Sequence, residues 1–401
     1  MSSNRKAGSI CHICGGNGLI PFPVYKKLPR VTSDSCSWPV GGRMVICDHC
    51  AGVQKIIDEG WRDEVEKIYS SYAVYKQGGG ADQAVFDKDT GTPHRRSDRL
   101  VECFSAQGNL QKQGRWLDIG CGNGAMLRSV SKSLPEWKLT GAELDDRNRK
   151  IVEEILGVEA FKTGGVESFE GPYDAISMIH VIEHIENPVG YLKELRSLLR
   201  LGGALFIEVP YFHDNSFELL IADHCTHFTP GSLRNILEAA GFDVVCSDTS
   251  WVRKEITMVA HLSEHVPETT NASLALSTSH ISSQYDQLKS HIDWLYGVGG
   301  EIREMAANKP FGIFGSANAA TFAYQWAEEE VAFFVDEDPA RCGRIHLGRP
   351  IFPPTSVPDG SVVYISLPQY LAKEIASRWA GGAVKYVVPK DFENYAGSAK
   401  N

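Results

Sequence analysis

The middle of the chain alternates short apolar runs with stretches in which apolar residues recur every three or four positions. The apolar runs predict buried strands, and they cover residues 116–119, 138–142, 173–180 and 204–210. Helical stripes follow the first and third of these runs, at Met126, Leu127, Val130 and Leu134 and at Leu192, Leu195 and Leu199. Gly202 and Gly203 should end the second stripe. Strands that alternate with helices predict an α/β fold with a parallel, doubly wound sheet.

A change of composition after His261 predicts a new folding unit. Residues 263–283 are rich in Ser and Thr and are predicted as a linker, and residues 285–305 have the apolar spacing of an amphipathic helix. A second strand, glycine turn and helix start follow at residues 310–320. Further strands are predicted at the apolar runs 331–336 and 362–367.

Composition limits the kinds of protein that this chain can be. A length of 401 residues with 43% hydrophobic residues is enough for two or three cores. The net charge of −10 gives no general attraction for DNA or RNA, so we expect a small-molecule substrate and no nucleic-acid partner. No apolar run has the length of a signal or a membrane span, so we expect no membrane partner and a cytoplasmic location. The sequence predicts no particular oligomeric state.

Two cysteine pairs near the start of the chain predict a metal site. Cys11 and Cys14 form one C-x-x-C motif, and Cys47 and Cys50 form another 32 residues later. Four thiolates saturate a tetrahedral Zn²⁺ ion and leave no position for water, so the expected role is structural. A redox role is the alternative, although no thioredoxin-like pattern surrounds either pair. The neighbouring His12 and His49 are expected to face solvent, and Cys36 is a spare candidate ligand.

The strand at residues 116–119 runs into a turn that suits a small-molecule ligand. Asp118, Gly120, Gly122 and Gly124 give the pattern D-x-G-x-G-x-G, with Asn123 inside the turn. The leading aspartate would repel a pyrophosphate, and the spacing differs from the dinucleotide motif, so NAD is disfavoured here. The strand at 138–142 ends in Glu143, whose carboxylate is suited to accept hydrogen bonds from two ribose hydroxyls.

The glycine turn and the acidic residue after the second strand resemble the first two signature motifs of class I S-adenosylmethionine-dependent methyltransferases. The run that ends at His180, with the segment after it, resembles the fourth-strand motif of the same superfamily. This resemblance implies that S-adenosylmethionine is the cofactor. It places the cofactor against Asp118, Gly120, Gly122, Asn123, Glu143 and His180.

A histidine-rich loop after the strand at 204–210 carries the candidate catalytic residues. Thr229 and Pro230 are a helix cap and first turn, so the histidines before them lie in a loop at the carboxyl edge of the sheet. His224 is the predicted general base and Asp223 its local partner. His227 and His184 are predicted as further acid–base or hydrogen-bonding groups. The alternative is that these histidines bind loop carbonyls or an adventitious metal.

The segments 69–80 and 91–99 combine tyrosines, glycines and arginines before the glycine turn. They predict either a flap over the site or a solvated loop. In a flap, Arg95, Arg96 or Arg99 would meet a carboxylate or a phosphate.

The whole layout resembles the sugar C-methyltransferases that act on nucleotide-linked 4-keto deoxysugars. Residues 223–229 match that family's E-H-x-x-x-F-S loop, with aspartate in place of glutamate at position 223 and threonine in place of serine at position 229. The family's histidine after the fourth strand falls on His184. The resemblance implies a nucleotide-sugar substrate and C-methylation with a histidine base. O-methylation of a glycan or small metabolite, and a binding protein without catalysis, are the alternatives.

The predicted architecture has three parts. Residues 1–68 form a small zinc-binding module, 69–264 the S-adenosylmethionine-dependent methyltransferase domain with its doubly wound sheet, and 265–401 a Rossmann-like α/β domain. The resemblance implies that the third part forms a wall of the substrate cleft. A second dinucleotide site is the alternative for its glycine turn.

Overall fold

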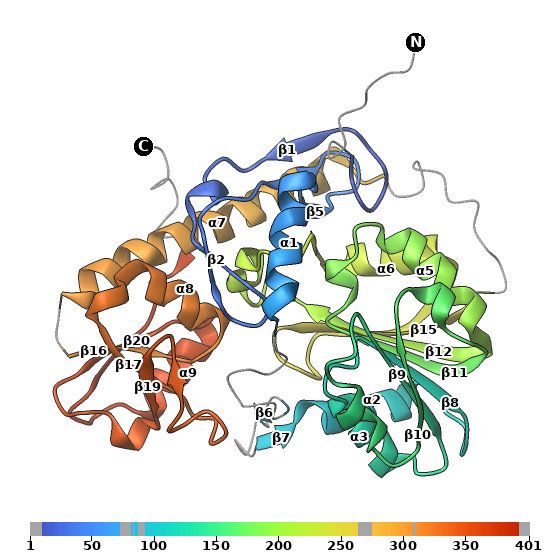
Figure 1. The fold of residues 1–401 in the computed structure, drawn as a ribbon. Coiled ribbons are helices and arrows are strands. Elements are labelled where there is room, and N and C mark those ends of the chain that lie inside the picture. Colours follow the sequence, from blue (N-terminus) through green and yellow to red (C-terminus); the bar gives the residue numbers. More distant parts are fainter. Residues whose placement is uncertain are drawn as a thin grey trace.

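The computed structural model describes residues 10–72, 82, 84–86, 93–263, 275–307 and 310–392. Two α/β units lie side by side, and a smaller unit built from the first part of the chain lies above and between them (Figure 1). No helix in the described ranges has both the length and the apolar character that a membrane span needs.

A seven-stranded sheet forms the core of the central unit. Its order is β10-β9-β8-β11-β12-β15-β14. Its strands are β8 (Arg115–Ile119), β9 (Lys138–Glu143), β10 (Val158–Thr163), β11 (Tyr173–Ile179), β12 (Leu199–Pro210), β14 (Phe242–Asp248) and β15 (Glu255–Leu262). β15 pairs antiparallel with both neighbours, whereas β10, β9, β8, β11 and β12 are parallel. The predicted all-parallel sheet is therefore mixed, because β14 and β15 follow each other closely enough to pair as a hairpin.

Helices cover both faces of this sheet, as a doubly wound fold requires. α2 (Arg96–Gln107) and α3 (Ala125–Ser133) pack on one face, and α5 (Pro188–Leu195) and α6 (Pro230–Ala239) pack on the other. The short α4 (Arg149–Glu153) precedes β10. A capping box between Thr229 and Ser232 starts α6, which confirms the predicted cap. Gly202 and Gly203 do not end a helix as predicted, because they lie inside β12.

The first unit is a small sheet with loops and one helix. β1 (Leu19–Pro21), β4 (Met44–Cys47) and β5 (Val53–Lys55) pair in that order, and β13 (Thr226–His227) from the central unit adds the fourth strand. The hairpin of β2 (Arg30–Val31) and β3 (Ser37–Trp38), the single turn η1 (Tyr25–Lys27) and α1 (Glu59–Ser71) complete it. The histidine loop predicted between β12 and α6 thus contains a strand of another sheet.

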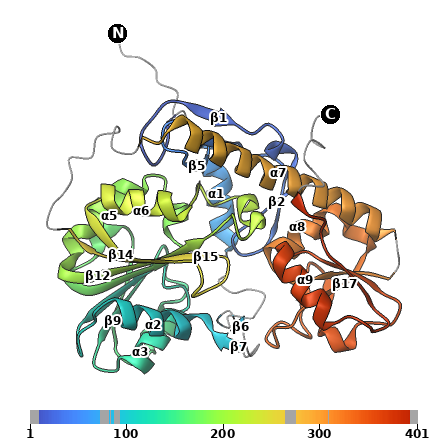
Figure 2. The ribbon, with the colours of Figure 1, turned by 180° about the vertical axis from the view of Figure 1, so that it is seen from behind.

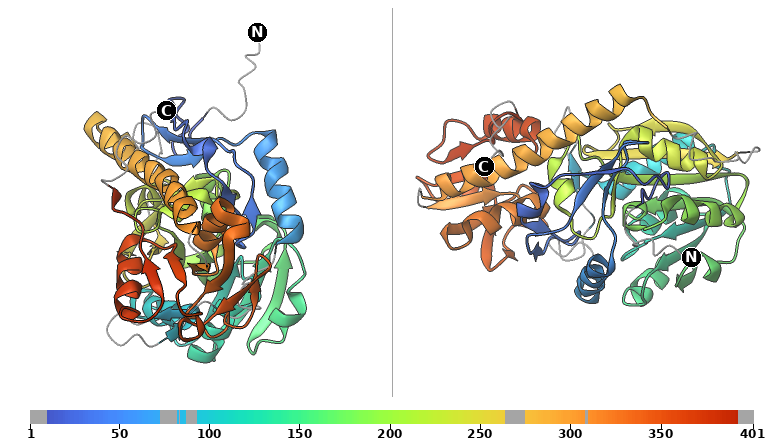
Figure 3. Two further views of the ribbon diagram at one scale, coloured as in Figure 1. Left: turned by 90° about the vertical axis from the view of Figure 1, so that its left-hand side faces the viewer. Right: turned by 90° about the horizontal axis from the view of Figure 1, so that it is seen from above.

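The last unit contains a six-stranded sheet of order β18-β19-β17-β16-β20-β21. Its strands are β16 (Phe311–Phe314), β17 (Val331–Val335), β18 (Ile345–His346), β19 (Arg349–Phe352), β20 (Val362–Ile365) and β21 (Lys385–Val387). The helices are α8 (Asn318–Ala327), α9 (Gln369–Arg378) and the long α7 (Thr278–Ala306), which runs across the back of the molecule (Figures 2 and 3). α7 begins within the range 263–283 predicted as a linker, and residues 264–274 lie outside the described part.

The predicted flap is described only in part. β6 (Ala84–Phe86) pairs with β7 (Pro93–Arg95), and α2 starts directly after β7. Arg96 and Arg99 therefore lie in a helix rather than in the loop that was predicted for 91–99. Residues 73–81, 83 and 87–92 of this region lie outside the described ranges.

Candidate active site and metal centre

The glycine turn after β8 has a backbone shape that residues with side chains rarely adopt. Gly120, Gly122 and Gly124 have φ angles of 69°, 53° and 85°. The N–H groups of Gly120 and Cys121 both donate to the carbonyl of Ala142 in β9, at 2.9 and 3.0 Å. A Cβ atom on Gly120 would lie 2.4 Å from a methyl group of Val181. The turn is therefore held tightly at the carboxyl end of the sheet.

Glu143 is bonded to this turn from the end of β9. One carboxylate oxygen accepts from the N–H of Gly122 at 2.8 Å, and the other accepts from the N–H of Leu144 at 2.9 Å. Asn123 accepts from Arg128 through its carbonyl at 2.7 Å. A carboxylate fixed by two backbone donors still has lone pairs for a pair of ribose hydroxyls. The residues present therefore fit the ribose end of S-adenosylmethionine.

Asp118 lies beneath the turn, not on its surface. It is 2% exposed and accepts a hydrogen bond from the hydroxyl of Ser177 at 2.6 Å. Burial raises its pKa to about 7. The structure therefore joins Asp118 to β11, where Ser177 is its register partner, and keeps it away from solvent.

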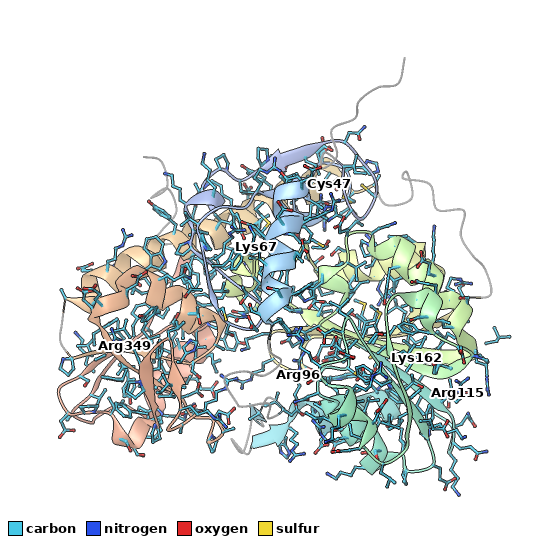
Figure 4. The ribbon with its side chains drawn as sticks, in the orientation of Figure 1. Cys47, Lys67, Arg96, Arg115, Lys162 and Arg349 are labelled. Atoms are coloured by element: carbon cyan, nitrogen blue, oxygen red, sulfur yellow. The ribbon has the colours of Figure 1, made fainter. Side chains whose placement is uncertain are left out.

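His180 directly follows β11 and belongs to a buried network of charged groups. Its φ of 57° is unusual for a residue other than glycine, and its N–H donates to the carbonyl of Glu208 at 2.9 Å. Its Nε2 lies 3.3 Å from Glu255. Arg96, which is labelled in Figure 4, donates from Nε to Glu208 at 2.7 Å. Burial opposes protonation of His180, but the negative charges of Glu255 and Glu183 outweigh burial and Arg96, so its pKa is raised.

Sequence reasoning did not single out Glu208 and Glu255 as members of this network. They belong to β12 and β15, whose pairing brings their ends together at the carboxyl edge of the sheet. An acidic residue within an otherwise apolar run was the signal for Glu208.

His224 is buried and paired with a carboxylate that was not predicted. Its Nδ1 lies 2.6 Å from Oε1 of Glu218, in the short helix η6 (Ser216–Leu220). Both side chains are 2% exposed. Burial holds the pKa of His224 well below its usual range, and the ring is therefore neutral near pH 7. Glu218, and not the predicted Asp223, is the partner that orients this imidazole.

Asp223 and His184 also lie next to His224. Asp223 accepts from the backbone N–H of Ser33 at 2.9 Å and also bonds the Ser33 hydroxyl. His184 Nδ1 lies 2.9 Å from the hydroxyl of Tyr69 and 3.1 Å from the carbonyl of Asp223. The rings of His184 and His224 meet edge to face with centroids 4.5 Å apart. Burial lowers the pKa of His184.

His227 shares the carboxylate of Glu218 with His224. Its Nδ1 lies 3.2 Å from the same Oε1 atom, and burial lowers its pKa to about 4. Its Nε2 is buried without a hydrogen-bond partner. All four predicted catalytic residues therefore lie in or beside one cluster around His224, and their chemical roles stay predictions.

The four predicted metal ligands converge in the first unit. Cys11 and Cys50 have Sγ atoms 3.5 Å apart, and those of Cys14 and Cys47 are 3.6 Å apart. Zinc–sulfur bonds of about 2.3 Å in a tetrahedron place sulfurs about 3.8 Å apart, so the arrangement fits Zn²⁺. All four side chains are buried, and Cys47 is labelled in Figure 4. Cys36 lies outside this cluster.

The segment that carries Cys11 and Cys14 is hydrogen-bonded directly to the histidine loop. His12 lies between two of the cysteines, and its Nδ1 is 3.3 Å from the hydroxyl of Thr226. His12 is partly buried and burial lowers its pKa to about 4, so it does not face solvent fully as expected. Lys55 donates from Nζ to the carbonyl of His224 at 2.9 Å, and Trp61 donates from its indole to that of Ala222 at 3.1 Å. The first unit therefore fixes the backbone of the candidate catalytic loop.

Comparison with known proteins identifies the family of the central part. A family model described as a methyltransferase domain matches residues 92–247. The central unit is a methyltransferase domain with the class I fold. This confirms the predicted fold class for that part of the chain and supports S-adenosylmethionine as its cofactor.

Curated relatives match over limited stretches. A ubiquinone biosynthesis O-methyltransferase of Parvibaculum lavamentivorans is 31% identical over 101 residues, which are 23% of this chain and 39% of that protein. The enzyme of the same name from Cereibacter sphaeroides is 26% identical over 152 residues, with 33% of this chain and 61% of that protein covered. The chain thus spans about two fifths to three fifths of these relatives.

A solved structure with a similar domain is the 1,6-didemethyltoxoflavin-N1-methyltransferase of Burkholderia thailandensis. It is 18% identical, the match covers 56% of this chain and 96% of that one, and the TM-score is 0.39. The narrower resemblance to sugar C-methyltransferases stays a prediction.

Proposed function

We propose that this chain transfers a methyl group from S-adenosylmethionine to a carbon atom of a nucleotide-linked keto deoxysugar, with His224 as general base. The observation that carries the proposal is the pairing of a buried, neutral His224 with Glu218 within the part of the chain that the methyltransferase-domain model matches. A neutral imidazole that donates one N–H to a carboxylate is an oriented base with its other nitrogen ready for a proton.

The residues of the loop can divide the chemistry between them. His224 would remove the proton alpha to the ketone, and Glu218 would stabilise the imidazolium that forms, through the 2.6 Å contact to Nδ1. His184, held by Tyr69, would donate a hydrogen bond to the enolate oxygen. Bound S-adenosylmethionine would supply the electrophilic methyl group for the enolate carbon and would leave as S-adenosylhomocysteine. The proton stays on His224 until solvent takes it.

Binding roles follow from the geometry around this loop. Glu143 and the glycine turn would hold the cofactor, and the four cysteines would hold a structural Zn²⁺ ion. The last unit contacts the central unit through Arg253 and Glu374, with Nη1 and Oε2 3.0 Å apart, and this contact supports a role as a wall of the acceptor site. We propose that the nucleotide of the acceptor binds along this wall.

O-methylation is the second candidate, and the names of the curated relatives favour it. A hydroxyl acceptor needs a base and correct positioning but no enolate. The same His224 would serve as the base.

Proton exchange at the acceptor carbon separates the two reactions. In D₂O without cofactor, a C-methyltransferase should exchange the proton alpha to the ketone of a nucleotide-linked keto sugar, and His224→Ala should abolish this exchange. With cofactor carrying a labelled methyl group, NMR should locate the label on that carbon. A label on oxygen would establish the second candidate. Failure of calorimetry to detect S-adenosylmethionine binding at millimolar concentration would overturn both.

A further inference from the structure

Glu183 is a buried carboxyl group without a hydrogen bond. It lies in the short helix η4 (Ile182–His184), is 1% exposed, and neither of its carboxyl oxygens has a hydrogen-bond partner. Nδ1 of His180 lies 3.5 Å from Oε1 of Glu183, and this contact is electrostatic and not a hydrogen bond. An ionised carboxyl group in this condition is costly, so it either takes up a proton or binds a cation that the protein itself does not supply.

Two histidines surround this carboxyl group with one nitrogen each already in use. Nδ1 of His224 contacts Glu218, and Nδ1 of His184 contacts Tyr69 and the carbonyl of Asp223. Nε2 of each ring is therefore left to coordinate. One ligand atom each from Glu183, His184 and His224 lies within 4.8 Å of the other two.

We propose that Glu183, His184 and His224 form a second metal site, for a divalent transition-metal ion such as Zn²⁺ or Co²⁺. Two imidazoles and one carboxylate suit such ions and leave coordination positions open for water or an acceptor oxygen. Oxygen acceptors behind metal-binding histidines fix the ring and its tautomer, and Glu218 and the Asp223 carbonyl occupy those places. In the metal site His184 would carry its proton on Nδ1, the opposite tautomer to the one that donates to an enolate oxygen. The side chain of His184 is 17% exposed and provides the open side of the site.

This site is separate from the four-cysteine centre in its ligands and in its chemistry. It does not depend on the proposed function, because metal binding is measured without an acceptor. A metal on Nε2 of His224 would, however, exclude proton abstraction by that nitrogen. Metal loading and base catalysis at His224 are therefore alternative states of one pocket.

The test uses full-length protein with one equivalent of zinc in the four-cysteine centre, titrated with Co²⁺. Wild type should bind one further equivalent whose absorption shows ligand-field bands without thiolate charge transfer. X-ray absorption should show only nitrogen and oxygen ligands. Glu183→Gln and His184→Gln should each lose this second equivalent and keep the first.

His227→Gln is the matched control, because His227 shares Glu218 but is not a proposed ligand. It should keep both equivalents. The retained zinc and an unchanged melting temperature report that each variant is folded. The proposal is overturned if wild type binds no second equivalent, if that equivalent has sulfur ligands, or if it persists in either Glu183→Gln or His184→Gln.

Discussion

Glu218 determines which nitrogen of His224 carries the proton. Because Nδ1 of the ring lies 2.6 Å from this buried carboxylate, the N–H is on Nδ1 and the basic lone pair is on Nε2. A negative charge at this distance also stabilises the imidazolium that a general base becomes. The base and its partner are thus one functional unit.

Glu218→Gln should lower kcat roughly 10²-fold, because the amide keeps the shape but removes the charge that stabilises protonated His224. Steady-state methyl transfer measures this, and calorimetry should give an unchanged affinity for S-adenosylmethionine. His227→Gln is the control, since it alters the other contact of Glu218. Equal losses in both variants would show that the effect does not pass through His224.

The pairing of Glu218 with His224 illustrates what sequence cannot give. The two residues are six positions apart, and the turn of η6 that brings them together has no periodic pattern. Asp223 is adjacent in sequence, but adjacent side chains of an extended loop point apart, and this carboxylate faces Ser33. The histidines themselves were predictable because their cluster before a capped helix is local.

In the pH profile of kcat/KM, the fall on the acid side should have its midpoint below the ordinary histidine pKa of about 6.5. Burial disfavours the charged ring and holds the pKa of His224 well below that value, so the base stays neutral as the pH falls through 6.5. A pH profile measured at saturating cofactor tests this. A midpoint at or above 6.5 would mean that another group is the base.

At the scale of elements, β13 joins the catalytic loop to the metal-binding unit. Thr226 and His227 pair with Gln54 and Val53 of β5, and Lys55 donates to the loop carbonyl of His224. The glycine turn and Glu143 depend on β8 and β9 instead. Loss of the structural metal should therefore affect the acceptor side of the site more than the cofactor side.

Cys47→Ser should reduce methyl transfer to background while S-adenosylmethionine binding persists. The four-cysteine centre ties together loops that have little other regular structure, so its loss loosens β5 and with it β13. Hydrogen exchange should report lost protection at residues 222–228 and retained protection in β8 and β9. Cys36→Ser, outside the cluster, should change neither measurement. Loss of cofactor binding in Cys47→Ser would contradict this division.

Strands with strong local patterns were predicted well, and pairings between distant segments were not. β9 and β11 match their apolar runs because burial on both faces gives a continuous signal. β13 has two residues, and its partner strand is more than 160 positions away. Such a strand is defined by its partner, so the sequence around His227 predicts only a loop.

At the scale of the whole molecule, all three units hold the segment between β12 and α6. The first unit contacts it through Lys55, and the last unit contacts it from α7. In that second contact His291 Nδ1 lies 2.7 Å from the hydroxyl of Ser216, and Phe217 packs edge to face against Trp294. The loop that carries Glu218 and His224 is therefore a junction, and its stability reports on the assembly of all three units.

His291 should make this assembly sensitive to acid. The side chain is 7% exposed, and burial, with a smaller effect of His213, lowers its pKa to about 3. The unfolded chain binds this proton near pH 6.5 and the folded chain does not, so the stabilisation is complete above 6.5 and falls as the pH drops towards 3. Between pH 7 and pH 4, protonation of this one residue in the unfolded chain should lower the free energy of unfolding by about 3 kcal/mol.

Urea unfolding of wild type and His291→Gln at pH 7 and pH 4 measures that cost. Glutamine does not titrate and can still bond Ser216, so the variant should lose less unfolding free energy than wild type between the two pH values, by about 3 kcal/mol. His280→Gln, on the exposed first turn of α7, should behave as wild type. Equal losses in wild type and His291→Gln would show that the junction at Ser216 tolerates a charged ring. Acid sensitivity would then have to arise elsewhere, for example at His12, His224 or His227, whose pKa values burial also lowers.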